Sequence, residues 1–353
     1  MILFHVALGL KSGLGHLSRS ITLAKDLKKK LNVSFLIPKD AVLARKILNQ
    51  NNIPTFSFEK GKKINELVHI FPKNIKAIII DISDAMYVKK PYLLTEYFHK
   101  IREKQIKLIV IDGLFKDRII CKDYPIFDIL IQPYIEVNLN EKASAIKHLR
   151  GPDYVLLDNA FKKNIQIKKK YIPKLAKSIV ISFGGSDPTL LTNEFCKFLT
   201  LNKEIFKEQL FTIILGPYME KKNQYIIKNQ IKELDNISIK NNIFNLKPFF
   251  DKSDLAILAS GSTTRYEAAS CGTPTLFFGI NKDHEIQCKI YEKSACAQYL
   301  GQQSKIIKSS LLEELVSIIN NKTKRYSMSK LGLNLIDGKG TSRLACEIFK
   351  IGL

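Results

Sequence analysis

Short apolar runs rich in β-branched residues alternate along this chain with longer amphipathic stretches. This alternation is typical of βαβ units, in which buried parallel strands are connected by helices. In the first half of the chain the pattern predicts strands at Ile2–Leu8, Val33–Ile37, Ala77–Asp81, Leu108–Asp112 and Ile129–Gln132. Together these strands predict one Rossmann-like sheet.

The same pattern returns after a lysine-rich stretch, residues 161–174, which we interpret as an interdomain linker. Beyond it, strands are predicted at Ser178–Phe183, Leu210–Leu215, Ile237–Ile239, Leu255–Ala259, Thr275–Phe278 and Ala297–Tyr299. A chain of 353 residues is long enough for two α/β domains. We therefore expect an N-terminal domain at residues 1–160 and a C-terminal domain at residues 175–335. A helix in residues 336–353 is expected to pack back on the N-terminal domain.

The chain is strongly basic, with 56 Lys and Arg against 33 Asp and Glu and a formal charge of +23. Such a balance favours anionic partners. The basic residues are dispersed and form no basic and aromatic stripe, so we interpret them as a solvated surface and expect no nucleic-acid partner. No apolar run approaches the roughly 18 residues of a membrane span. We therefore expect a cytoplasmic protein with no transmembrane segment, for which peripheral membrane contact is left open.

The six cysteines are far apart and form no CxxC pair, so the sequence predicts neither a zinc site nor a disulfide framework. No metal or other cofactor is expected.

The first candidate for chemistry is the turn between the first strand and an amphipathic helix, where Gly13 and Gly15 precede His16. Glycines let backbone amides approach an anion, and a helix N-terminus favours negative charge there. A dinucleotide-binding fingerprint would need a glycine where Ser18 stands and an acidic residue at the end of the second strand, but the nearest acid, Asp40, follows that strand by several residues. The sequence therefore does not favour NAD binding. His16 lies at the ligand-bearing edge and is a candidate base. The alternative is an imidazole that only caps the helix.

A second glycine turn opens the C-terminal domain, where Gly184, Gly185 and Ser186 follow a predicted strand. Asp187 is predicted to be the N-cap of the next helix, with Pro188 as its first residue. The paired glycines would let the backbone lie against a ligand. A purely structural turn is the alternative.

The third candidate is a small-residue loop that begins a helix and offers amides and hydroxyls to a diphosphate. It consists of Gly261, Ser262, Thr263 and Thr264. Glu267 follows within the first turns of the helix, where a carboxylate can accept hydrogen bonds from a ribose diol. The alternative is a capped helix with a solvated glutamate. A polar cluster with His284, past the strand Thr275–Phe278, could meet sugar hydroxyls or phosphates, or cap a helix.

Four segments, spread over nearly the whole chain, together resemble one known family. They are Gly13-Leu14-Gly15-His16 with Arg19, Gly151-Pro152-Asp153-Tyr154-Val155-Leu156-Leu157, Ser182-Phe183-Gly184-Gly185-Ser186-Asp187-Pro188, and Gly261-Ser262-Thr263-Thr264 with Glu267. The chain thereby resembles the PseG family, UDP-2,4-diacetamido-2,4,6-trideoxy-β-L-altropyranose hydrolases of pseudaminic acid biosynthesis, which serves cell-surface polysaccharides. That family is related to the MurG-type glycosyltransferases of the GT-B fold.

The resemblance implies two Rossmann-like α/β domains that face each other across a cleft, the GT-B fold. It implies that UDP lies mainly on the C-terminal domain, with Glu267 at the ribose and Gly261–Thr264 at the diphosphate. His16 would activate water for inverting attack on the anomeric carbon, without a metal. The substrate-binding residues expected around it are Gly13, Gly15, Arg19, Gly184, Gly185, Ser186, Gly261, Ser262, Thr263, Thr264, Glu267 and His284.

Two departures from the family pattern concern the sugar side of the site. The family usually has an Asp-x-Tyr segment, but this chain reads Asp81-Ile82-Ser83-Asp84, so the partner of His16 is left open. Tyr266 stands where some members have asparagine. A MurG-like inverting glycosyltransferase is the alternative to the hydrolase, because both would use the same UDP-sugar site. They differ in whether water or an acceptor hydroxyl attacks. The oligomeric state is also open.

Overall fold

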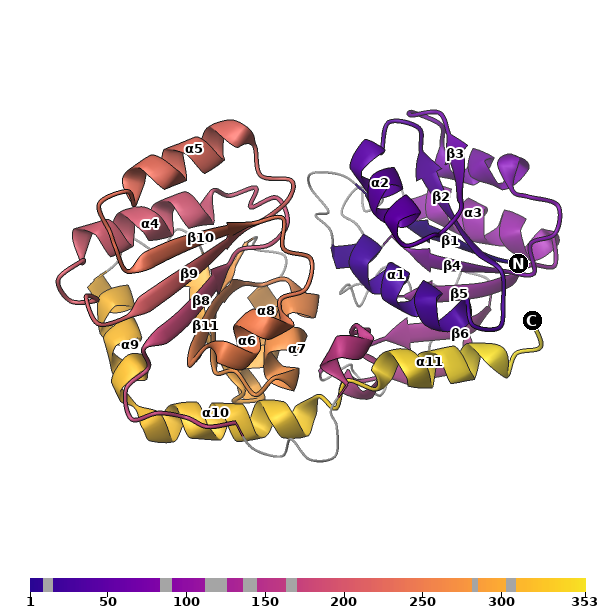
Figure 1. The fold of residues 1–353 in the computed structure, drawn as a ribbon. Coiled ribbons are helices and arrows are strands. Elements are labelled where there is room, and N and C mark those ends of the chain that lie inside the picture. Colours follow the sequence, from indigo (N-terminus) through magenta and orange to yellow (C-terminus); the bar gives the residue numbers. More distant parts are fainter. Residues whose placement is uncertain are drawn as a thin grey trace. The chain divides into compact units, whose positions relative to one another are not determined.

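The computed structural model describes residues 1–8, 15–82, 91–111, 126–135, 145–162, 170–280, 285–302 and 309–353. These residues form two compact units (Figure 1). The N-terminal unit contains Met1–Asp158 and Lys339–Leu353, and the C-terminal unit contains Asn159–Gly338.

The N-terminal unit is built on a seven-stranded sheet in the order β3-β2-β1-β4-β5-β6-β7, whose neighbouring strands are parallel. The strands are β1 (Ile2–Val6), β2 (Val33–Pro38), β3 (Thr55–Phe58), β4 (Ala77–Asp81), β5 (Lys107–Ile111), β6 (Phe127–Gln132) and β7 (Ala145–Arg150). The strands predicted from the sequence are confirmed, but β3 and β7 were missed. Both are edge strands with half-exposed side chains, so they lack the continuous apolar run of a central strand.

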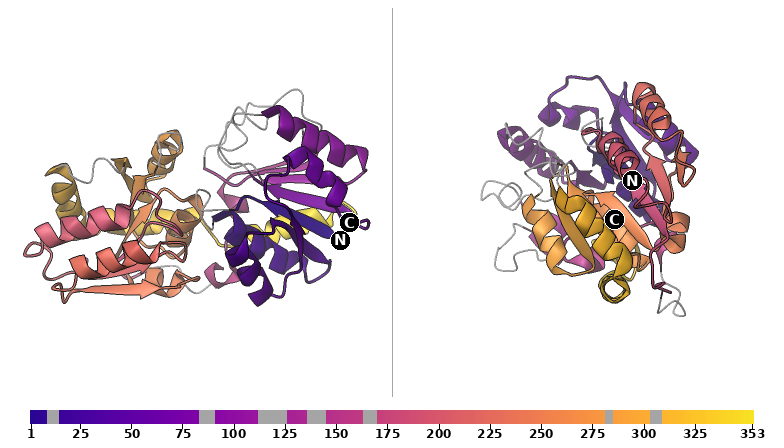
Figure 2. Two further views of the ribbon diagram at one scale, coloured as in Figure 1. Left: turned by 90° about the horizontal axis from the view of Figure 1, so that it is seen from above. Right: turned by 90° about the vertical axis from the view of Figure 1, so that its left-hand side faces the viewer.

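Helices cover both faces of this sheet, as Figure 2 shows. They are α1 (Gly15–Leu27), α2 (Val42–Gln50), α3 (Pro91–Glu103), α11 (Gly340–Phe349) and the 3₁₀ turns η1 (Ile64–Ile70) and η3 (Pro152–Tyr154). Alternate residues of β1 point to opposite faces of the sheet. Ile2, Phe4 and Val6 pack in one core with α1, α2 and α11, whereas Leu3 packs on the other face with residues of α3 and η1. A strand of this kind is buried on both faces, which explains why its sequence is almost entirely apolar; the one polar residue of β1, His5, is buried as well.

The last helix of the chain, α11, belongs to the N-terminal unit and lies beside α1 (Figure 1). Leu344 and Ile348 are fully buried in the core that α1 also lines. Polar contacts fix the start of α11: Thr341 donates to the carbonyl of Leu157 at 2.8 Å, and Ser342 donates to Asp26 at 3.0 Å. The final segment therefore completes the first core.

The C-terminal unit contains a six-stranded parallel sheet in the order β10-β9-β8-β11-β12-β13. Its strands are β8 (Ser178–Ser182), β9 (Leu210–Leu215), β10 (Ile237–Asn241), β11 (Leu255–Ala259), β12 (Thr275–Gly279) and β13 (Ala297–Gln302). Its helices are η4 (Asn159–Phe161), α4 (Leu191–Leu201), α5 (Lys221–Gln230), α6 (Lys247–Lys252), α7 (Ser262–Ser270), α8 (Glu285–Lys293), α9 (Ser309–Asn320) and α10 (Lys322–Leu335). The prediction of a second Rossmann-like sheet is confirmed.

A buried arginine of α10 ties the segment before β8 to the end of α9. The side chain of Arg325 is fully buried and donates to the carbonyls of Pro173 and Lys174 at 3.0 and 2.9 Å. Its Nε also donates to the carbonyl of Ile318 at 3.0 Å. This carbonyl lies near the C-terminus of α9, where the helix dipole favours a cation.

Candidate functional site

The start of α1 and the loops at Gly184 and Gly261 lie where each sheet reverses its strand order. In the first sheet β1 and β4 are neighbours, with β2 on one side and β5 on the other; in the second sheet β8 and β11 stand in the same relation. Ligands of open α/β sheets bind outside the carboxyl ends of the strands at such a switch point. His16 is the second residue of α1, the helix that follows β1, whereas the Gly184 turn follows β8 and the Gly261 loop follows β11.

In the N-terminal unit five side chains form one hydrogen-bonded group, which we call the His16 cluster: His16, Arg19, Ser20, Asp81 and Tyr134. Nδ1 of His16 lies 2.7 Å from Oδ1 of Asp81. Arg19 holds the same carboxylate with two donors, since Nε donates to Oδ2 at 2.6 Å and Nη2 donates to Oδ1. Nη1 of Arg19 donates to the hydroxyl of Tyr134 at 3.2 Å, and Ser20 donates to Oδ2 of Asp81 at 3.3 Å.

Burial and charge act in opposite directions on the Asp81 carboxyl. Complete burial alone would raise its pKa, but the positive charge of Arg19, with a contribution from His16, holds the pKa well below its usual range. Burial would likewise lower the pKa of Arg19, whereas the adjacent carboxylate raises it above the ordinary value. The pair is therefore a buried, ionised carboxylate and guanidinium, with 19% of the His16 side chain exposed beside them.

The cluster supplies the partner of His16 that the sequence left open. Asp81 is the last residue of β4 and pairs in register with Val6 of β1, so its side chain reaches the start of α1. The signal available in the sequence was an acid ending a buried strand. Tyr134, which follows β6, places a tyrosine hydroxyl in the same cluster. Its position gave no indication of this, because it lies 115 residues from Arg19.

In the C-terminal unit the backbone of the Gly184–Gly185 turn packs against the residues that follow β9. Gly184 has a φ of +93°, and the amide of Tyr218 donates to the carbonyl of Gly185 at 2.8 Å. A Cβ atom on Gly216 would lie 2.2 Å from the carbonyl oxygen of Gly184 and 2.3 Å from that of Gly185. Gly216, which sequence reasoning missed, is therefore required for this close backbone approach.

The role predicted for Asp187 is wrong in detail. Helix α4 begins at Leu191, not at Pro188, because Asp187 and Leu190 both adopt left-handed backbone conformations (φ 42° and 53°) that delay the helix. The buried Asp187 carboxylate accepts the amides of Leu191 and Thr192 at 2.9 and 2.8 Å. Burial raises its pKa, although these hydrogen bonds oppose the shift. The first amides of α4 are thus occupied by the protein's own carboxylate.

The helix that follows β11 differs from α4 at its N-terminus. Gly261 is the N-cap of α7, and no side-chain capping bond is found there among the residues that the structure describes. Thr263, Thr264 and Glu267 are half-buried. An α-helix begins with amides that lack intrahelical partners and favour an anion. Because β8 and β11 are paired, the α7 N-terminus and the Gly184–Ser186 turn lie at the same edge of the sheet.

Tyr266, noted in the sequence as a departure, is buried in the layer between α7 and α8. Its ring meets that of Tyr291 at 5.4 Å. Tyr291 also donates to the carbonyl of Arg265 at 3.1 Å. The tyrosine at position 266, where some PseG members have asparagine, is therefore a packing residue between α7 and α8.

Two of the expected site residues, Gly13 and His284, lie outside the described residues, as does the side chain of Ser262. Within the described ranges, no three His, Cys, Asp or Glu side chains lie close enough to hold a metal ion. No helix in the described part of the chain is both long and apolar enough to cross a bilayer.

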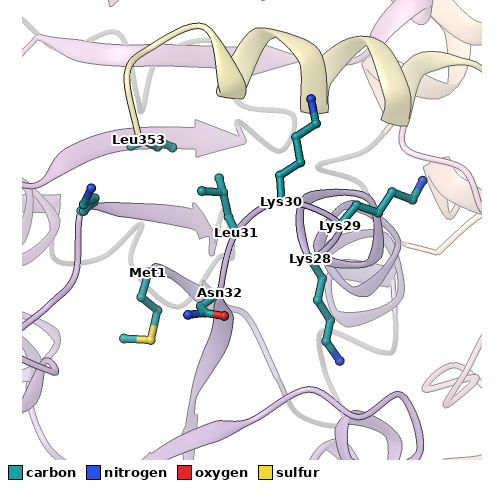
Figure 3. A pocket seen from close by; sticks show the side chains of 8 residues that line it. Met1, Lys28, Lys29, Lys30, Leu31, Asn32 and Leu353 are labelled. Atoms are coloured by element: carbon teal, nitrogen blue, oxygen red, sulfur yellow. The ribbon is translucent and has the colours of Figure 1, made fainter.

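A separate pocket of about 420 Å³ lies at the amino end of the first sheet and is lined by Lys28, Lys29, Lys30 and Lys76, among others. Its three consecutive lysines point in different directions (Figure 3). Lys28 donates to the carbonyl of Asn52 at 2.6 Å, Lys29 pairs with Asp26, and Lys30 lies over the ring of Phe349. These lysines follow the C-terminus of α1, where cations are favourable, and they do not converge on one point.

No protein-family model matches the chain. The uncharacterized protein MJ1062 of Methanocaldococcus jannaschii is 28% identical over 291 residues, 79% of this chain, and the chain spans 55% of that protein's length. The spore coat polysaccharide biosynthesis protein SpsG of Bacillus subtilis is 24% identical over 347 residues, covering 95% of this chain and 94% of SpsG. A Lactococcus lactis UDP-N-acetylglucosamine–N-acetylmuramyl-(pentapeptide) pyrophosphoryl-undecaprenol N-acetylglucosamine transferase is 28% identical over 169 residues, 46% of each chain.

Solved structures of similar fold cover almost the whole chain. Acinetobacter baumannii MurG superposes with a TM-score of 0.67 at 15% identity, covering 99% of both chains. A structure of S. aureus MnaA with UDP superposes with a TM-score of 0.63 at 15% identity, covering 99% of this chain and 96% of that one. The two parallel-sheet α/β units thus have the GT-B fold, as A. baumannii MurG does.

Proposed function

We propose that this protein binds a UDP-sugar and breaks the bond between its anomeric carbon and the diphosphate. The assignment of the nucleotide to the C-terminal unit rests on one observation at the second switch point. The amides that begin α4 are occupied by Asp187, whereas α7 begins without a side-chain cap of this kind among the described residues. The diphosphate is therefore assigned to Gly261–Thr264, with the Gly184–Ser186 turn beside it. Glu267 accepts hydrogen bonds from the ribose hydroxyls.

The likeness to a UDP-sugar transferase and the overlap with a UDP-bound protein support this assignment of the nucleotide. In the proposal His16 acts as a base on the nucleophile that attacks the sugar. The nucleophile's oxygen bonds to the anomeric carbon and its proton passes to His16. The anomeric carbon–oxygen bond breaks from the opposite side, its electron pair leaving with UDP. Amides at α7 stabilise the diphosphate, so no step needs a metal.

The general kind of reaction favoured by the relatives is transfer of the sugar to an acceptor hydroxyl, because the Lactococcus lactis relative is a transferase. Hydrolysis, in which water is the nucleophile, is the second candidate. It is favoured by the resemblance of the His16, Gly184 and Gly261 segments to the PseG hydrolases. A cytoplasmic location, with no nucleic-acid partner, belongs to the same proposal.

The function is tested by incubating the protein with a panel of UDP-sugars, including N-acetylated and diacetamido sugars, and measuring UDP release with and without acceptor alcohols. Release without an acceptor would identify a hydrolase. Release that requires an acceptor would identify the transferase. If no sugar in the panel yields UDP under either condition and UDP itself does not bind, the proposal is wrong.

A further inference from the structure

The Nδ1 atom of His16 lies within hydrogen-bond distance of both a carboxylate, which can only accept, and a guanidinium, which can only donate. Nδ1 lies 2.7 Å from Oδ1 of Asp81 and 3.0 Å from Nη2 of Arg19. A carboxylate can only accept a hydrogen bond, whereas a guanidinium can only donate one. A proton on Nδ1 would therefore suit Asp81 and leave the lone pair of a neutral imidazole on Nε2. A lone pair on Nδ1 would suit Arg19 and leave the proton on Nε2. Only the first arrangement makes Nε2 a base.

The contacts of the cluster favour the proton on Nδ1. Without it, two acceptors would face each other at 2.7 Å, and one of them would carry the charge of a fully buried carboxylate. With it, two donors approach at the longer distance of 3.0 Å. Arg19 also has other acceptors, because its three nitrogens already donate to both Asp81 oxygens and to Tyr134.

Arg19 has a second effect through the charge of Asp81. Burial would raise the pKa of this carboxyl, and the guanidinium keeps it ionised. A neutral carboxylic acid in the same place could donate its own proton to Nδ1 and reverse the tautomer. The position of the proton on His16 therefore depends on the positive charge of Arg19 as well as on Asp81.

We propose that the ion pair of Arg19 and Asp81, anchored by Tyr134, fixes the neutral His16 with its proton on Nδ1 and its lone pair on Nε2. Arg19 and Asp81 are thus positioning residues that act through His16. The inference rests on the proposed function for its consequence, namely that Nε2 receives the proton of the attacking hydroxyl. The tautomer itself is a property of the free protein and can be measured without substrate.

The test is nitrogen-15 NMR of the full-length protein at mildly alkaline pH, with two-bond proton–nitrogen correlations that distinguish the two tautomers. The His16 signals are assigned by their loss in His16→Gln. We expect the parent protein to show the proton on Nδ1. In Asp81→Asn, the single amide oxygen is required by Arg19 and the amide group turns toward His16, so the proton is expected to move to Nε2. Turnover should fall at least about 100-fold with little change in KM, as expected when a general base has the wrong tautomer.

Matched variants separate charge from packing. Arg19→Lys keeps a cation and is expected to keep the Nδ1 proton, whereas Arg19→Met is expected to lose it. Ser20→Ala removes another hydrogen bond to Asp81 without removing charge, and the tautomer should not change. A parent protein with the proton on Nε2, an unchanged tautomer in Asp81→Asn, or a reversed one in Ser20→Ala would each overturn the inference. The predicted tautomer in a protein that hydrolyses or transfers no sugar would refute the proposed function alone.

Discussion

A His16→Ala variant is expected to release UDP from its substrate about 10²–10⁴ times more slowly than the parent protein, with an unchanged affinity for UDP. The rate falls because no group then takes the proton of the nucleophile. The affinity is preserved because His16 belongs to the N-terminal unit, whereas the nucleotide is assigned to α7 in the C-terminal unit. Initial rates of UDP release and a calorimetric titration with UDP give the two quantities.

The matched control for this experiment is His69→Ala. His69 is an exposed histidine of η1 in the same unit, so its loss should change neither the rate nor the affinity. A His16→Ala protein as fast as the parent would show that another group is the base. Equal losses in both variants would indicate a general effect on the N-terminal unit.

Replacing Gly216 by alanine is expected to displace the Gly184–Gly185 turn and to weaken binding of the UDP-sugar at least about tenfold. The added Cβ would stand 2.2 Å from the carbonyl oxygen of Gly184, a backbone atom that cannot turn aside as a flexible side chain would. Overpacking of this kind also costs stability, typically about 1–3 kcal/mol. Calorimetric titration measures the affinity, and thermal unfolding measures the stability.

Thr212→Ala is the control for Gly216→Ala. Thr212 lies in the same strand, β9, toward its amino end and away from the turn, and its side chain is half-buried. We expect this variant to bind the UDP-sugar like the parent protein. A Gly216→Ala protein that folds and binds with parental affinity would show that the turn makes no contribution to the nucleotide site.

Hydrophobic periodicity was sufficient to predict the central strands, because strands such as β1 and β11 are buried on both faces and have almost entirely apolar sequences. It failed at the two edges of the first sheet, where the side chains of β3 and β7 are partly exposed. The delayed start of α4 was also missed, since a left-handed conformation at Leu190 is a tertiary outcome that aspartate and proline cues do not reveal.

Short motifs in the sequence supplied candidate site residues, which stay predictions, whereas contacts between residues distant in sequence could not be predicted. The glycines before His16 and the small residues at Gly261 are local sequence patterns, so they could be proposed as site residues from the sequence alone. The contact between His16 and Asp81 spans 65 residues and depends on β1 and β4 being neighbours. The close contact between the Gly184 turn and Gly216 likewise depends on the pairing of β8 with β9.

We propose that the C-terminal unit binds UDP at α7, with Glu267 on the ribose. Calorimetric titration of the whole protein with UDP tests it most directly, in parallel with Glu267→Ala and with Glu233→Ala, an exposed glutamate of the same unit, as the control. We predict saturable binding by the parent protein and by Glu233→Ala, and at least about tenfold weaker binding by Glu267→Ala, as expected for lost hydrogen bonds to a charged group. Absence of UDP binding by the parent, or identical affinities in Glu267→Ala and the parent, would contradict the claim.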